Sequence, residues 1–126
     1  MRATAQLQIA IALCAITACT TTPAAKDVPA IIVRPDTQSR ADLQSAVSKA
    51  LNRTSVTLAD DALTHDSSLT IEPVRLRDPQ GNIAQGRETR MPEHFRLVES
   101  GHRCVLIHER TGQRMELANT KCAAKR

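Results

Sequence analysis

The chain has 126 residues, the length of one small domain, with a single phenylalanine, no tryptophan or tyrosine, and a net charge of +4. With only one aromatic side chain on which a base could stack, we expect no nucleic-acid-binding function. No catalytic, cofactor-binding or metal-binding motif is recognisable, so we expect neither enzymatic activity nor a cofactor or metal.

The first 18 residues have the features of a cleaved export signal. Arg2 provides a positive charge, the apolar run 7–15 is too short to span a bilayer, and small residues follow it. The segment ends in Ile16-Thr17-Ala18-Cys19, which resembles the lipobox of bacterial lipoproteins. This resemblance implies that signal peptidase II cuts before Cys19. It also implies that Cys19 carries the acyl chains, palmitate among them, that hold the protein on a membrane.

The resemblance further implies a location. Thr20, rather than aspartate, follows Cys19, as in lipoproteins that are passed on to the outer membrane. In a Gram-negative envelope the anchor would lie in the inner leaflet of the outer membrane, with the domain in the periplasm. The alternative is an ordinary secretory signal, cut after Ala18 or near Ala24 or Ala25, which leaves a soluble periplasmic protein.

Residues 19–29 are predicted to form a polar tether. A single domain is predicted over residues 30–122, followed by a basic tail, residues 123–126. The first strand is expected at Ala30-Ile31-Ile32-Val33, a largely β-branched run that ends just before Arg34-Pro35.

A helix is predicted to begin at Ser39 and to end near residue 53. Ser39 can cap the first turn, and Asp42 stands at the position of its capping-box partner. Apolar residues then recur at helical spacing and form one stripe, Leu43, Ala46, Val47, Ala50 and Leu51. Such a stripe requires a sheet to cover.

Further strands are expected at residues 56–58 and 68–74, separated by an acidic turn and followed by a long loop, residues 77–92. Residues 95–117 indicate a three-stranded meander. A three-residue loop at residues 110–112 sets apolar side chains opposite one another across the last hairpin, which a two-residue loop at residues 111–112 does not. The same criterion favours a three-residue loop at residues 100–102. This register places one apolar row beneath the helix, Phe95, Leu97, Val105, Ile107, Met115 and Leu117, and turns Cys104 to the other face.

Cys104 and Cys122 are the two cysteines that remain once Cys14 leaves with the signal and Cys19 is acylated. In an oxidising compartment they are predicted to form a disulfide. Such a bond would contribute roughly 3 kcal/mol to a domain with almost no aromatic core. A pair of free thiols or half of a metal site is the alternative.

Other polar clusters favour structural roles. The sequence His65-Asp66-Ser67-Ser68 holds the residue types of a hydrolase triad, but neighbours in sequence point in different directions, so we expect no catalytic site there. Asp60 and Asp61 beside them indicate a solvated acidic turn. The histidines at positions 94, 102 and 108 are expected on the surface.

The C-terminal half is basic, since residues 73–126 carry eleven lysines or arginines against six acidic residues. Arginine's planar fork suits carboxylates and phosphates. A candidate anion-binding surface therefore consists of Arg75, Arg77, Arg87, Arg90, Arg96 and Arg103. The alternative is an ordinary solvated surface.

These observations predict an α+β fold, a small two-layer sandwich in which one helix covers a mostly antiparallel sheet. The first functional hypothesis is a non-enzymatic, lipid-anchored envelope protein, an accessory or assembly factor that binds another envelope protein. The second is a binder of anionic envelope polymer or glycolipid, such as peptidoglycan or lipopolysaccharide, through the arginine-rich half. A third is an inhibitor of a cell-wall-degrading enzyme that acts through loop 77–92.

Overall fold

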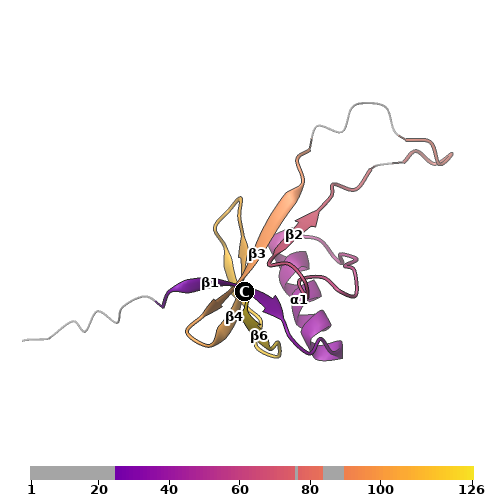
Figure 1. Ribbon diagram of the computed structural model, residues 1–126. Coiled ribbons are helices and arrows are strands. Elements are labelled where there is room, and N and C mark those ends of the chain that lie inside the picture. Colours follow the sequence, from indigo (N-terminus) through magenta and orange to yellow (C-terminus); the bar gives the residue numbers. More distant parts are fainter. Residues whose placement is uncertain (1–24, 76, 84–89) are drawn as a thin grey trace, which may run out of the picture.

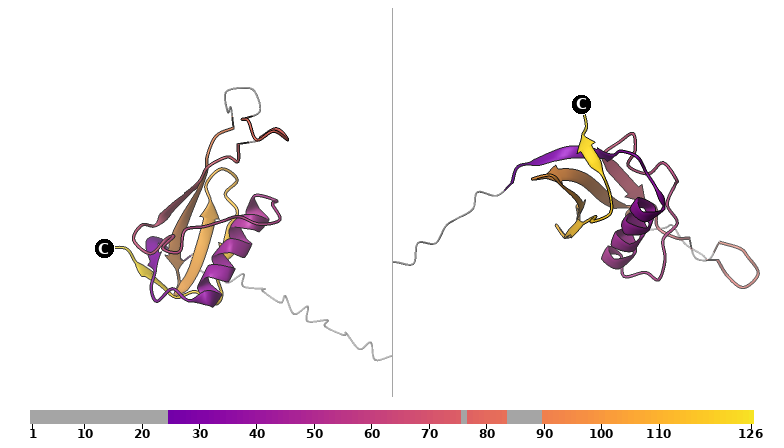
Figure 2. Two further views of the ribbon diagram at one scale, coloured as in Figure 1. Left: turned by 90° about the vertical axis from the view of Figure 1, so that its right-hand side faces the viewer. Right: turned by 90° about the horizontal axis from the view of Figure 1, so that it is seen from below.

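The structure is a computed structural model that describes residues 25–75, 77–83 and 90–126 (Figure 1). One helix and six strands follow one another in the order β1 (Asp27–Ile32), α1 (Thr37–Ala50), β2 (Ser68–Ile71), β3 (Glu93–Ser100), β4 (Arg103–His108), β5 (Arg114–Glu116) and β6 (Cys122–Ala124). Every pair of neighbouring strands is antiparallel, and α1 packs along one face of the curled sheet (Figure 2). The predicted α+β class is confirmed.

Strand β3 is the centre of the sheet, whose order is β5-β4-β3-β1-β6. One edge of β3 pairs with β4 from Phe95 to Ser100. The other edge is shared, because β2 pairs with its first half and β1 with its last residues. Strand β1 then leaves β3, and its second half, Ala30–Ile32, pairs with β6. The start of β1 and the start of β3 therefore lie at opposite ends of the sheet.

Strand β1 begins at Asp27, so the last three residues of the predicted tether belong to the sheet. Pro29 does not prevent this, because proline is tolerated where its missing N–H is not needed by a neighbouring strand. At the other end, Ala123 and Ala124 of the predicted basic tail lie in β6 and pair with β1. The folded unit thus extends beyond the predicted bounds at both ends.

The helix begins two residues before the predicted start. Asp36 is the N-cap, and its carboxylate accepts a hydrogen bond from the Ser39 amide at 2.8 Å, while the Ser39 hydroxyl accepts one from the Asp36 amide at 2.8 Å. Ser39 is thus the third helical residue, and the two side chains form a reciprocal capping box. Asp42 has a different role, since its carboxylate binds the Asn119 amide at 2.6 Å and so ties α1 to the segment after β5.

The predicted strand at residues 56–58 is not formed. Val56 is buried, but its carbonyl accepts a hydrogen bond from the Gln44 side chain at 3.0 Å instead of joining a ladder. Strand β2 ends at Ile71, short of the predicted residue 74, because Pro73 cannot donate to a ladder.

The predicted register of the meander is wrong by one residue at each turn. The β3–β4 turn is Gly101-His102, both with positive φ, and the β4–β5 loop spans residues 109–112. Leu97 therefore faces Leu106, and Leu106 faces Met115. Because β4 carries apolar residues at three successive positions, 105–107, its pattern alone does not decide which face is buried beneath the helix.

The core lies between α1 and this corrected face of the sheet. Its fully buried side chains include Val47 of α1 together with Phe95, Leu97 and Leu106 of the sheet and Leu117 after β5. The predicted disulfide is present, with Cys104 and Cys122 joined across a Cα separation of 5.9 Å. Cys104 belongs to this core and not to the opposite face, since it shares a face with Leu106 two residues on.

Candidate functional site

The predicted lipid-attachment residue, Cys19, and the export signal lie outside the described residues. Within the described part of the chain, no helix has the length and apolarity that a membrane crossing requires. Lipid anchoring through Cys19 therefore stays a prediction from the sequence.

The predicted arginine surface separates into two groups. Arg75, Arg77 and Arg90 lie on the segment between β2 and β3, whereas Arg96 of β3 and Arg103 of β4 lie on the sheet face that turns away from the helix. Arg87 lies outside the described residues. The fold thus does not bring the five described members of the predicted set together as one surface.

The segment between β2 and β3 projects from the body of the domain (Figure 1). We call its described residues, 72–75, 77–83 and 90–92, the arm. At its tip the Asp78 carboxylate accepts hydrogen bonds from the amides of Gln80 and Asn82, and Gly81 takes a positive φ of 85°. Arg77 and Ile83 pair on either side of this turn. The tip is therefore a closed turn held by its own polar groups.

The base of the arm is closed by a contact between its two sides. The Arg90 guanidinium donates a hydrogen bond to the Val74 carbonyl at 2.8 Å. Beside this bond lies a hollow of about 460 Å³, lined by Glu72, Pro73, Arg75, Arg90 and Pro92. Two prolines stiffen this base, because each fixes its own φ.

The arm carries the three large apolar side chains that are most exposed in the described part of the chain. Val74 is 60% exposed, Ile83 52% and Met91 80%. Exposed apolar groups gathered beside arginines are typical of protein interfaces, in which methionine and arginine are enriched. Sequence reasoning identified this segment as a long loop but not its apolar side chains, because exposure cannot be read from composition.

The sheet face that turns away from the helix carries paired charges. The Arg114 guanidinium donates two hydrogen bonds to the Asp27 carboxylate, at 2.7 and 2.8 Å. Together with a hydrogen bond from Ser100, this contact lowers the pKa of Asp27 to about 2. Arg103 likewise forms an ion pair with Glu116 at 3.3 Å. Much of the positive charge on this face is thus neutralised within the domain.

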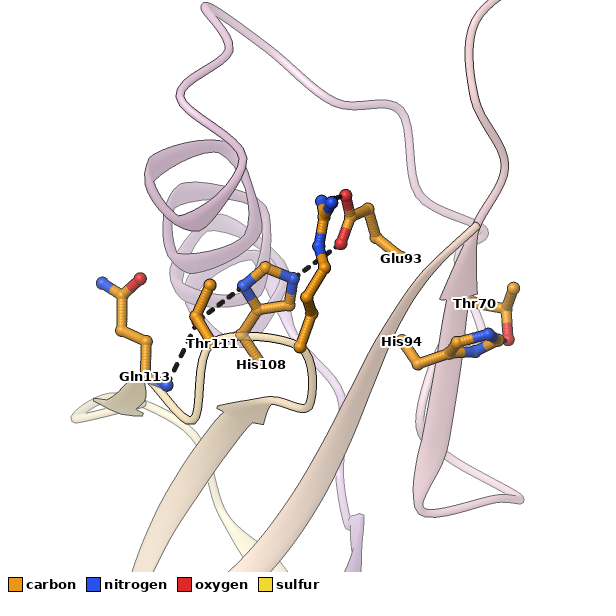
Figure 3. Close-up of polar contacts among 7 residues, drawn as sticks. Thr70, Glu93, His94, His108, Thr111 and Gln113 are labelled. Carbon is orange, nitrogen blue, oxygen red and sulfur yellow. Dashed lines mark hydrogen bonds and ion pairs between the residues drawn. The ribbon is translucent and has the colours of Figure 1, made fainter. Parts of the chain in front are cut away.

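One predicted surface histidine is buried. His108 is 2% exposed, its Nε2 lies 2.8 Å from the Glu93 carboxylate, and its Nδ1 lies 2.9 Å from the Thr111 hydroxyl (Figure 3). The ring stacks on Phe95 with centroids 4.7 Å apart, and Arg110 forms an ion pair with Glu93. The corrected register explains this position, because His108 pairs with Phe95 on the helix side of the sheet.

The imidazole of His108 lies between a hydroxyl and a carboxylate, so the three groups of an acyl-transfer relay are present. Both ring nitrogens are occupied and the ring is covered, so the arrangement favours a structural role. It joins the loop after β4 to the start of β3. The two other histidines of the meander are exposed, and His94 contacts Thr70 of β2 on the far side of β3 (Figure 3).

The acidic turn does not gather its carboxylates. Asp60 forms an ion pair with Arg40 of the helix, and Asp66 binds Lys125 near the C-terminus at 2.9 Å, which lowers the pKa of Asp66. Across the described residues, no cluster of three or more histidine, cysteine, aspartate or glutamate side chains is placed to hold a metal ion.

A groove of about 230 Å³ lies between α1 and residues 57–62. Its floor includes Ile32, Leu43 and Leu58, and the ion pair between Arg40 and Asp60 stands at its rim. Two hydroxyls line the groove, but that of Ser39 is held in the capping box of α1 and no histidine lies beside Thr57 in the lining, so the groove offers apolar contact but no recognisable catalytic arrangement.

Comparison of the chain with protein-family models, with curated proteins and with solved structures gives no significant match.

Proposed function

We propose that the protein is a lipid-anchored component of the cell envelope that binds another envelope protein through the arm. The observation that carries this proposal is the concentration of exposed apolar side chains, Val74, Ile83 and Met91, on a segment that projects from the domain. The partner surface that fits the arm is an apolar depression bordered by carboxylates, which would accept the arm's arginines.

The position of the arm suits such a role. The arm joins the sheet at the start of β3, whereas Asp27, the first residue of β1, pairs with Ser100 at the end of β3. Eight residues of strand at about 3.3 Å each separate these two ends by roughly 23 Å. If the tether leads to the outer membrane, the arm is presented on the side of the domain away from the bilayer.

The ion pairs described above weaken the second hypothesis, a binder of anionic polymer. Arg103 already has a carboxylate partner in Glu116, and Arg96 is attracted electrostatically by the Asp27 carboxylate. An anionic polymer would have to compete with these internal carboxylates. On the arm, by contrast, arginines stand beside apolar groups, a combination that suits a protein surface better than a polyanion.

The test replaces the three apolar side chains of the arm with serine (Val74→Ser, Ile83→Ser and Met91→Ser together) in the full chain. Gentle crosslinking in cells, followed by purification, should recover an envelope protein with the wild type and lose it with the triple variant. The matched control keeps the apolar character by Val74→Ile, Ile83→Leu and Met91→Leu. It should retain the partner.

Because all three side chains are exposed, the unfolding midpoint of the serine variant should stay close to that of the wild type. Equal recovery of the partner by the serine variant and the wild type would contradict docking through the arm. Recovery of no protein by either one would instead favour a polymer or glycolipid ligand, and sedimentation with purified sacculi would follow.

A further inference from the structure

We infer that the outer edge of β5 pairs with β5 of a second copy of this chain, so that two copies form one continuous sheet across a two-fold axis. This interface is separate from the arm and does not depend on the proposed function. Strand β5 ends the described sheet on one side. No other segment in the described ranges pairs with its outer edge.

The hydrogen bonds on the inner edge show which groups face outward. The Gln113 carbonyl accepts a bond from the His108 amide, and the Leu117 amide donates one to the Cys104 carbonyl. The odd-numbered residues of β5 therefore bond inward to β4, because antiparallel partners bond at alternate positions. The amides and carbonyls of Arg114 and Glu116 point outward, where a further strand would pair.

The side chains of these two residues select one register. Charged residues on an edge strand ordinarily discourage pairing. A symmetric register centred on Arg114 or on Glu116 would place that residue opposite the same residue of the second copy, and the two like charges would repel each other. The register centred on Met115 instead places Arg114 of each copy opposite Glu116 of the other. Opposite charges directly across an antiparallel pair are favourable.

This register also joins ion pairs that already exist within each copy. Asp27 holds Arg114 in a forked contact, and Arg103 holds Glu116 at 3.3 Å. Across the axis, the sheet face would carry a row of alternating sign that runs Asp27, Arg114, then Glu116 and Arg103 of the second copy. Each guanidinium has donors beyond those used within its own copy.

The helix side of the edge is open as well. A groove of about 370 Å³ between α1 and β5 is lined by Ala46 and Lys49 of the helix and by Met115 of the strand. Asp42, whose carboxylate accepts hydrogen bonds from Asn119 within its own copy, lies at the other end of the same helix face. The two-fold axis would set the two helices antiparallel, so that Lys49 of one copy faces Asp42 of the other while the two Met115 side chains fill the groove. Such a self-complementary patch is typical of two-fold dimers.

The register is tested by cysteine crosslinking of the full chain in cells. In the proposed pairing the two Met115 residues oppose each other as a pair without mutual hydrogen bonds, with Cα atoms about 4.5 Å apart. Met115→Cys should therefore give a covalent dimer on mild oxidation, joined at position 115 by mass spectrometry. In the same register, position 113 of one copy lies four residues from position 113 of the other. Gln113→Cys should therefore give at least tenfold less covalent dimer.

Charge variants provide a test that needs no new cysteine. Arg114→Glu alone and Glu116→Arg alone each place like charges opposite each other, so each variant should lose the dimer. Co-expressed with different tags, the two variants should purify together, because every cross-axis pair is then of opposite sign. Circular dichroism of each variant checks that the domain is folded.

The inference is overturned if Met115→Cys yields no more covalent dimer than Gln113→Cys. It is equally overturned if the folded charge variants, expressed together, co-purify no better than either does with itself. Efficient crosslinking at position 113 instead would show pairing in another register.

Discussion

At the scale of single residues, the contact between Asp27 and Arg114 fastens the first strand to the last strand of the meander, 87 positions along the chain. The guanidinium fork and the Ser100 hydroxyl hold the pKa of Asp27 at about 2, below its ordinary value of 3.8. A carboxylate with a depressed pKa stabilises the folded state fully above the unfolded-state pKa. This contribution is lost as the pH falls toward the folded-state pKa.

Asp27→Asn should therefore lower the unfolding midpoint at pH 6, where the wild-type carboxylate is charged in both states. The difference between variant and wild type should shrink as the pH falls from about 4 to about 2, because protonated aspartate resembles asparagine. Thermal unfolding followed by circular dichroism across this range measures it. A difference that stays constant down to pH 2 would show that Asp27 acts through its shape and not its charge.

The residues that sequence reasoning placed wrongly are those whose environment depends on strand pairing. His108 and Glu93 are distant in sequence, and they meet only because β3 and β4 pair with a Gly101-His102 turn. A histidine at the end of an apolar strand is compatible with either face. The disulfide between Cys104 and Cys122 was predictable because it required only the count of cysteines and an oxidising compartment.

At the scale of elements, the helix shows what a local pattern can establish. Its apolar stripe at Leu43 and Val47 is buried as predicted. Its first residue was misplaced, because Asp36 and Ser39 are both good caps and the sequence contains both. The strand register was harder, since one slipped residue exchanges the two faces of β4 and the apolar run at residues 105–107 suits both.

The disulfide fastens a short edge strand to the core. Strand β6 has three residues and pairs with β1 alone, and Cys122 joins it to Cys104 in the core. We expect reduction to lower the free energy of unfolding by about 3 kcal/mol, the chain-entropy value for a loop of this size.

Urea unfolding with and without reductant measures this difference. A variant that carries both Cys104→Ala and Cys122→Ala is the control and should not respond to reductant. An unchanged urea midpoint for the wild type in reductant, with the thiols shown to be free, would mean that strand pairing alone holds β6.

At the scale of the whole molecule, the fold class could be predicted because an amphipathic helix and several apolar strands leave few ways to build one core. The arm could be predicted only as a loop. Its apolar side chains are separated in sequence by polar ones, and their common exposure follows from the projection of the segment between β2 and β3.

The predicted membrane location can be tested by replacing a single atom. Cys19→Ser removes the sulfur to which the lipobox resemblance assigns the acyl chains. Two or more buried chains hold a protein on a bilayer far more firmly than one, at roughly 0.8 kcal/mol for each methylene. The wild type should remain in the membrane pellet after a carbonate wash, and the variant should appear in the supernatant. Retention of the variant in the pellet would contradict the lipid anchor.

The antiparallel pairing of β1 with β3 has a mechanical consequence. Strands β1 and β3 are antiparallel, and the tether and the arm each enter at the N-terminal end of one of them. A pull between an anchored tether and a bound arm would draw the two strands past each other lengthwise. The hydrogen bonds between them would then bear the load together instead of opening one after another. Such a shear arrangement resists force far better than an unzipping one, which would suit the proposed role of the domain between a membrane and a partner.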